Sequence, residues 1–158
     1  MAETKIRARK ATALLKEDHQ KVKKLYRDYE KLEDEEADEK SEIFRKIQKE
    51  LEVHAQIEEE IFYPAIEEGG EEEAGELIKE AHEEHRVVKT LLEELSGMTP
   101  GDEDFDAKLK VCMENTLHHA EEEESEIFQL FDKLEKDTRD LVSEQLAERK
   151  RELMPDVE

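Results

Sequence analysis

A histidine and a glutamate share the apolar side of one stretch, LEVHAQIEEEIFYP, at residues 51–64. His54 and Glu58 are four residues apart, so on a helix both point to the same side. Leu51 and Ile61 lie on that side as well, whereas the other side is polar. Burying a histidine with a glutamate costs free energy unless another group neutralises or bonds them. A metal ion would do this, and so would solvation or local hydrogen bonds; this stretch alone favours neither.

Apolar residues recur at helical spacing in four long segments of the chain. We expect helices at about residues 12–32, 38–67, 72–96 and 102–136, with the start of the last one at Asp102 or Asp104. Gly69 and Gly70 end the second helix, and Gly97, Pro100 and Gly101 follow the third. No segment alternates with a period of two, so no sheet is expected. The pattern predicts an all-α fold, an antiparallel up-down-up-down four-helix bundle.

Two further segments flank this bundle, which we place at residues 13–136. Residues 1–12 are a polar lead-in, and residues 137–158 are predicted to form an additional C-terminal helix and a tail. On that last helix Leu141, Gln145 and Leu146 lie on one side. The segment is weakly apolar, so we expect it to pack outside the bundle or to fray.

Composition narrows the possible partners. The chain has 158 residues, 46% of them charged, and its formal charge is 25 − 47 = −22. Such a surface repels phosphate backbones and anionic lipid, so neither nucleic acid nor a membrane is an expected partner. Cys112 is the single cysteine, which excludes an intrachain disulfide. The sequence shows no secretory signal and no apolar span, and a reducing cytoplasm is the expected location.

All six histidines fall within the predicted helices, and at least one per bundle helix lies on the inner side: His19, His54, His82, His85, His118 and His119. One histidine on an apolar face is usually a satisfied core residue. Four helices that each send one inward are harder to explain in that way. Two inward carboxylates, Glu58 and Glu123, accompany them. Imidazole and carboxylate together suit iron, manganese or zinc, so the combined pattern predicts metal binding.

The helical register indicates which of two neighbouring histidines faces the interior of the bundle. At about 100° per residue, His119 is about 40° from Glu123 and His118 about 140°, so His119 shares the inner side. His82 is about 60° from His85, and either a second ligand or a boundary residue fits that angle. The candidate metal ligands are His19, His54, Glu58, His82, His85, His119 and Glu123. Tyr63 could reach the site but is assigned no role, and Cys112 is predicted to be a buried thiol.

Four segments resemble the helices of a hemerythrin-like domain of the HHE cation-binding type: LLKEDHQKVKKLY, HAQIEEEIFYPAI, EEHRVVKTLLEEL and HHAEEEESEIFQLF. The resemblance runs from about Ala13 to Leu134, and the order and spacing of these short motifs make it specific. It implies two non-haem iron ions (Fe2+/Fe3+) joined by an oxo or hydroxo group. It also implies that Glu58 and Glu123 bridge the irons and that His19, His54, His85 and His119 bind them.

The resemblance also implies a range of activities. The family binds O2 reversibly, and its members also sense oxygen or iron, handle nitric oxide, hold iron or decompose peroxide. We therefore predict a di-iron protein that binds or senses O2 or a related small ligand such as NO. The alternatives are a peroxide-decomposing, catalase-like enzyme and an iron-holding or interaction module, so whether the chain is an enzyme stays open.

Two departures separate this chain from the oxygen carriers. The carriers have histidines four apart on the third helix, whereas His82 and His85 are three apart. Their last carboxylate is an aspartate five residues after its histidine, whereas Glu123 follows His119 by four. Fewer histidine ligands leave more open positions, which favours reactivity over clean O2 carriage. A ferritin-like site is excluded, because it needs Glu-x-x-His and no histidine here has a glutamate three residues before it.

Overall fold

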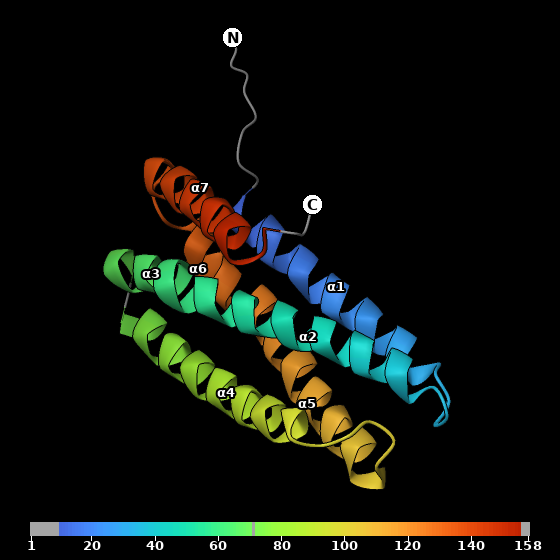
Figure 1. Cartoon of the computed structure of the whole chain (residues 1–158). Helices are drawn as coiled ribbons and strands as arrows, with labels where there is room; N and C mark the ends of the chain where they lie inside the picture. The colour runs from blue at the N-terminus through green and yellow to red at the C-terminus, as the bar shows by residue number, and fades with distance from the viewer. Residues whose placement is uncertain (1–9, 71, 156–158) are drawn as a thin grey trace.

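The computed structural model describes residues 10–70 and 72–155, and within them the chain is helical with no named strand. The elements are α1 (Ala11–Glu30), α2 (Ala37–Ile57), η1 (Glu58–Phe62), α3 (Tyr63–Gly69), α4 (Glu72–Ser96), α5 (Glu103–Glu122), η2 (Glu123–Ile127), α6 (Phe128–Asp132) and α7 (Lys136–Leu153). Four long rods lie side by side: α1, α2 with η1 and α3, α4, and α5 with η2 and α6 (Figure 1). This confirms the predicted all-α helical bundle. No helix among the described residues is long and apolar enough to cross a membrane.

The second and fourth rods each contain a five-residue π-helical segment that the sequence pattern did not predict. η1 and η2 begin at Glu58 and Glu123, the two inward glutamates. A π-helical turn bonds each N–H to the carbonyl five residues earlier, one residue more than an α-helix. Pro64 lies in the first turn of α3, directly after η1.

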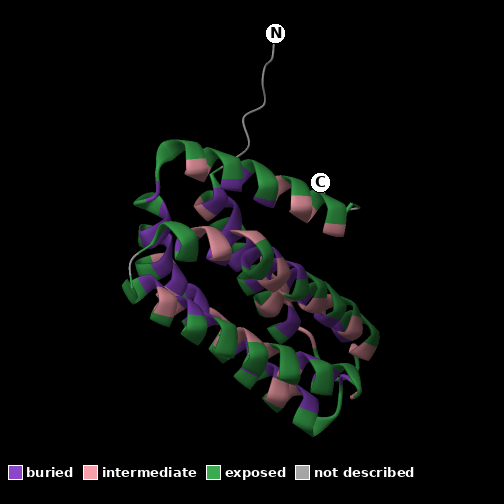
Figure 2. Cartoon of the chain, turned by 90° about the vertical axis from the view of Figure 1, so that its left-hand side faces the viewer, coloured by how far each residue is buried: buried purple, intermediate pink, exposed green. Residues whose placement is uncertain are grey.

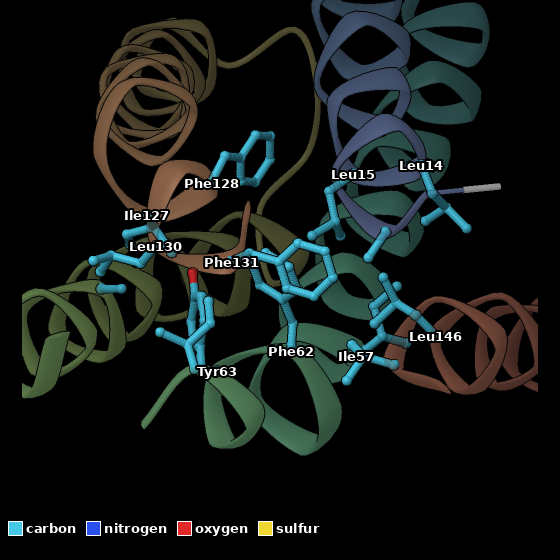
Figure 3. Close-up of a cluster of buried hydrophobic side chains, with 14 of the residues drawn as sticks. Leu14, Leu15, Ile57, Phe62, Tyr63, Ile127, Phe128, Leu130, Phe131 and Leu146 are labelled. Carbon is cyan, nitrogen blue, oxygen red and sulfur yellow. The ribbon is translucent and has the colours of Figure 1, made fainter. Parts of the chain in front are cut away.

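Buried apolar side chains form two clusters, one toward each end of the bundle. Figure 2 shows the buried residues facing inward and the exposed residues facing out. The first cluster includes Leu15, Ile57, Phe62, Tyr63 and Phe131 (Figure 3). The second is built around other residues: Val22, Ile47, Leu92, Phe105 and Leu109. On each rod an inward histidine falls between residues of the two clusters, so the polar layer lies across the middle of the core.

α7 packs on α1, α2 and η1, which confirms that a fifth helix lies outside the four rods. Its inner side differs from the predicted one. Leu146 is buried as expected, but Leu141 is 55% exposed and Val142 and Ser143 are buried in its place. The Ala11 N–H donates to the Ser143 Oγ at 2.8 Å, so docking against the start of α1 selects this side of α7. α7 is thus docked rather than frayed. The domain boundary at residue 136 stays a prediction.

Candidate metal centre

Four histidines, one from each rod, converge with two fully buried glutamates. The side chains are His19 of α1, His54 of α2, His85 of α4, His119 of α5, Glu58 of η1 and Glu123 of η2. Their ligand atoms form two groups in which all atoms lie within 4.8 Å of one another. One group holds His19 and His54 with both glutamates; the other holds His85 and His119 with Glu58. The structure therefore brings together six of the seven predicted ligands.

Each glutamate presents one oxygen to each pair of histidines. Glu58 Oε2 is 3.2 Å from the Nε2 of His54, and Glu58 Oε1 is 3.1 Å from the Nε2 of His85. Glu123 Oε1 is 3.1 Å from the Nε2 of His19, and its Oε2 is 3.7 Å from the Nε2 of His119. Each carboxylate thus lies between two pairs of imidazole nitrogens, a geometry in which one carboxylate could contact two metal ions.

The π-helical segments explain how a glutamate and the aromatic residue five positions later on the same rod both face the interior. In an α-helix, residues five apart are about 140° apart around the axis. In η1 the Tyr63 N–H bonds the Glu58 carbonyl, and in η2 the Phe128 N–H bonds the Glu123 carbonyl. These bonds turn both five-residue pairs to the same side. All four side chains are buried.

Every one of the four histidines is held by a carboxylate at its other ring nitrogen. The Nδ1 distances are 2.7 Å from His19 to Glu124, 2.9 Å from His54 to Asp18, 2.6 Å from His85 to Glu59 and 2.5 Å from His119 to Glu84. A carboxylate that accepts from Nδ1 fixes the ring and its tautomer and leaves Nε2 free to bind metal. We call Asp18, Glu59, Glu84 and Glu124 the outer carboxylates.

None of the outer carboxylates was among the residues that the sequence pattern predicted for the site. A signal for them was present, because each outer carboxylate directly precedes or follows a predicted ligand: Asp18-His19, Glu58-Glu59, Glu84-His85 and Glu123-Glu124. The first and third pairs match each other, and so do the second and fourth. The two halves of the bundle thus repeat one scheme.

Tyr63 breaks this repeat. Its hydroxyl donates to Glu123 Oε2 at 2.5 Å, and it lies 3.2 Å from Glu58 Oε1 and 3.4 Å from the Nε2 of both His85 and His119. In Figure 3 the hydroxyl is turned toward the segment of Ile127 and Phe131. In the other half Phe128 stacks on His19, with 6.1 Å between ring centres, and carries no hydroxyl.

Comparison with known proteins identifies this arrangement. Residues 10–131 match the hemerythrin HHE cation binding domain. The chain belongs to the hemerythrin HHE family. Its structure is similar to the crystal structure of an HHE cation-binding domain-containing protein from Mycobacterium kansasii, with a TM-score of 0.79, 25% identity and coverage of 93% of this chain and 88% of that one. A DNA nickase from Nostoc sp. is 30% identical over 116 residues, which are 73% of this chain but only 31% of that relative.

The electrostatics of this HHE site favour bound positive charge. Burial lowers the pKa of His54, but the charge of Glu58 and the bond to Asp18 outweigh it and raise that pKa well above its usual value. Burial also lowers the pKa of His85, but its hydrogen bonds to Glu58 and Glu59 outweigh that effect and raise the pKa to about 9. Burial alone would raise the pKa of Glu123, yet its contacts with Glu58 and the histidines hold it well below the usual range.

The donor atoms fit the metal that the HHE family implies. The Nε2 of His54 and the Oε2 of Glu58 are buried without a hydrogen-bond partner, and both lie in the first ligand group. Unpaired buried polar atoms are costly, and a cation would satisfy both. Imidazole nitrogens and carboxylate oxygens suit iron, manganese and zinc.

The two remaining histidines lie outside this centre. His82 has a side chain that is 42% exposed, its Nδ1 is 4.0 Å from Glu59, and its ring edge meets Tyr63. It joins neither ligand group of the centre, because its register turns it to the flank of α4. His118 is 66% exposed and pairs with Glu122, in agreement with the register argument. Cys112 is a buried thiol, and burial raises its pKa to about 12.

A cavity of about 670 Å³, lined by residues of α1, α2, α4 and α5, reaches the histidines. Its lining combines aliphatic side chains, among them Val22, Leu51 and Leu92, with charged ones, among them Glu52, Arg86 and Lys89. Small-molecule sites in proteins commonly occupy 300–1,000 Å³. The centre is therefore open to a small ligand from one side, whereas the first apolar cluster covers the Tyr63 side.

Proposed function

We propose that this chain is a non-haem di-iron protein that binds or senses O2, or a related small ligand such as NO. The observation that carries the proposal is the pair of buried glutamates, each with one oxygen toward either histidine pair. His19 and His54 would hold one iron, His85 and His119 the other, and Glu58 and Glu123 would bridge them together with an oxo or hydroxo group. Bound iron would supply a reversible change of charge and open positions for a small ligand.

The residues of the chain prepare this site before any ligand arrives. The outer carboxylates keep the Nδ1 proton on each histidine and aim Nε2 at the centre. Tyr63 holds a proton at Glu123 Oε2, since burial and the charges of Glu58 and Glu123 raise its pKa well above the usual value.

Peroxide decomposition is the second candidate. It is favoured by the small number of converging histidines and by the Tyr63 hydroxyl on the His85 and His119 side. Fewer histidine ligands leave open positions at a metal, which suits turnover better than carriage. An activity on DNA like that named for the Nostoc relative is not proposed, because a charge of −22 repels phosphate backbones.

The test is reconstitution with ferrous iron without air, followed by metal analysis and absorption spectra before and after exposure to O2, NO and hydrogen peroxide. We expect two irons per chain and a near-ultraviolet band after air. His54→Ala should lose most of the iron, whereas the matched variant His118→Ala, one residue from a ligand but exposed, should keep it.

The outcomes separate the candidates. A spectral change that reverses when O2 or NO is removed supports binding, and sustained O2 release from hydrogen peroxide supports the enzyme. Bound iron that responds to none of these ligands would leave an iron-holding module. Absence of stoichiometric iron, or equal iron in the two histidine variants, would reject the proposed centre.

A further inference from the structure

The C-terminal helix reaches the metal centre. α7 lies beyond residues 10–131, which the family comparison matches, yet it is anchored at several points. Ser143 bonds the first residue of α1, Leu146 is fully buried, and Arg149 Nε donates to Glu60 Oε1 at 2.8 Å. These contacts fix α7 against α1 and η1, and they place the next residue, Lys150, beside Asp18.

Lys150 is joined to a metal-binding histidine through two consecutive hydrogen bonds. Its Nζ donates to Asp18 Oδ1, the other oxygen of Asp18 accepts from His54 Nδ1 at 2.9 Å, and His54 Nε2 lies in the first ligand group. Asp18 is only 2% exposed, and the Lys150 side chain is 19% exposed. Charges at such a place are weakly screened by solvent, so their mutual effects are large.

The other three outer carboxylates lack this partner. Glu59, Glu84 and Glu124 are each partly exposed, and no ion pair between described residues joins any of them to a lysine or arginine within 4.0 Å. The two halves of the centre therefore differ. Among the four outer carboxylates, Asp18 of His54 is the one with an ion pair to an ammonium group within 4.0 Å in the described part of the chain.

We propose that Lys150 is a positioning residue that acts through Asp18 on His54 and raises the reduction potential of the iron held by His19 and His54. A carboxylate that accepts from Nδ1 makes the histidine a more basic ligand, and this stabilises the more highly charged metal. Lys150 pairs with Asp18, so that Asp18 accepts less strongly from His54, and it adds a positive charge near the iron. Both effects disfavour the ferric ion. The inference rests on the proposed iron pair.

The test compares midpoint potentials of the iron-loaded full chain, titrated with redox mediators while absorption is recorded. Lys150→Gln removes the charge but keeps a hydrogen-bond donor. We expect the midpoint potential of one of the two irons to fall by about 59 mV. For a one-electron couple this is a roughly tenfold shift of the ferric-to-ferrous ratio toward ferric. Lys150→Met should shift the same way, and Lys150→Arg should keep the native potential because it keeps the charge.

Arg149→Met is the matched control, because it breaks the contact of α7 with Glu60 and leaves Lys150 and Asp18 in place. Its potential should equal that of the native chain. Native potentials in both Lys150→Gln and Lys150→Met, at two irons per chain, would overturn this inference alone. So would an equal shift in Arg149→Met, which would mean a general loosening of α7. Failure of the native chain to bind two irons would instead reject the proposed function and this inference with it.

Discussion

Tyr63 and Phe128 occupy matching places, each five residues after a buried glutamate, and a single hydroxyl distinguishes them. The Tyr63 hydroxyl bonds a carboxylate that is fully buried, so removing the hydroxyl takes a hydrogen bond from a charge that bulk solvent does not reach. Phe128 covers His19 with an apolar ring only. At the scale of residues, the surroundings of the two ligand groups therefore differ in polarity although their histidines and glutamates match.

Tyr63→Phe should destabilise the metal-free protein. The change removes one oxygen and leaves the ring, so the loss is that of a hydrogen bond to a charged group, about 1.5–3 kcal/mol. Tyr29→Phe is the control, because the Tyr29 hydroxyl also donates to a carboxylate, but its acceptor Asp106 is 45% exposed and can bond water. Urea unfolding should show the smaller loss for Tyr29→Phe, and equal losses would contradict the assigned role of Tyr63.

The π-helical segments are the elements on which the centre depends. Both were predicted as uninterrupted α-helix, because a single extra residue changes the apolar period too little to be seen in the sequence. In the structure each segment lets a glutamate and the aromatic residue five positions later face the same interior. Such segments are frequent at functional sites.

Deleting Ser125 should test this role of η2. Ser125 is exposed, and its loss would let the segment return to α-helix. Residues after it would then rotate by about 100° relative to α5, so that Glu123 and Phe128 could no longer face inward together. We expect loss of iron and a destabilisation of about 3–5 kcal/mol, the usual cost of removing a buried phenylalanine from a core.

Ser125→Ala is the control for that deletion, since it keeps the chain length. Calorimetric unfolding and iron analysis of both variants make the comparison. A deletion variant that binds iron and unfolds at the same temperature as Ser125→Ala would show that the extra residue is dispensable.

The molecule as a whole carries an excess of negative charge at its surface and in its centre. Its formal charge of −22 coexists with two buried glutamates and four outer carboxylates around the ligand histidines. Like charges at close range destabilise a compact state, and salt screens those near the surface. Cations bound at the centre would relieve part of this repulsion from within.

Added salt should therefore stabilise the metal-free protein. Between 10 mM and 0.5 M sodium chloride, where the screening length falls from about 30 Å to only a few Å, we expect a gain of about 1 kcal/mol, or roughly 2–4 °C in Tm. The iron-loaded protein should respond less, since its centre is already neutralised. An unchanged or lower Tm of the metal-free protein in high salt would contradict this view of its charge balance.

Much of this molecule follows from local rules. The period of the apolar residues predicted four rods and a fifth helix, and the register of His85, His119, Glu58 and Glu123 predicted which side chains meet. The helical register also predicted that His118 points outward, and its side chain is 66% exposed. His82 stayed undecided because an angle of about 60° allows either side, and the packing of α4 placed it at the surface.

The sequence by itself determined the helices, the bundle and the inward histidines and glutamates, because these depend on periodicity within a single helix. The tertiary structure alone decided which carboxylate holds which histidine, where Tyr63 places its hydroxyl, and that Lys150 lies on Asp18. Those contacts join helices that are far apart in the chain, 132 residues apart for Lys150 and Asp18. They depend on how the rods and α7 pack together, which no local pattern encodes.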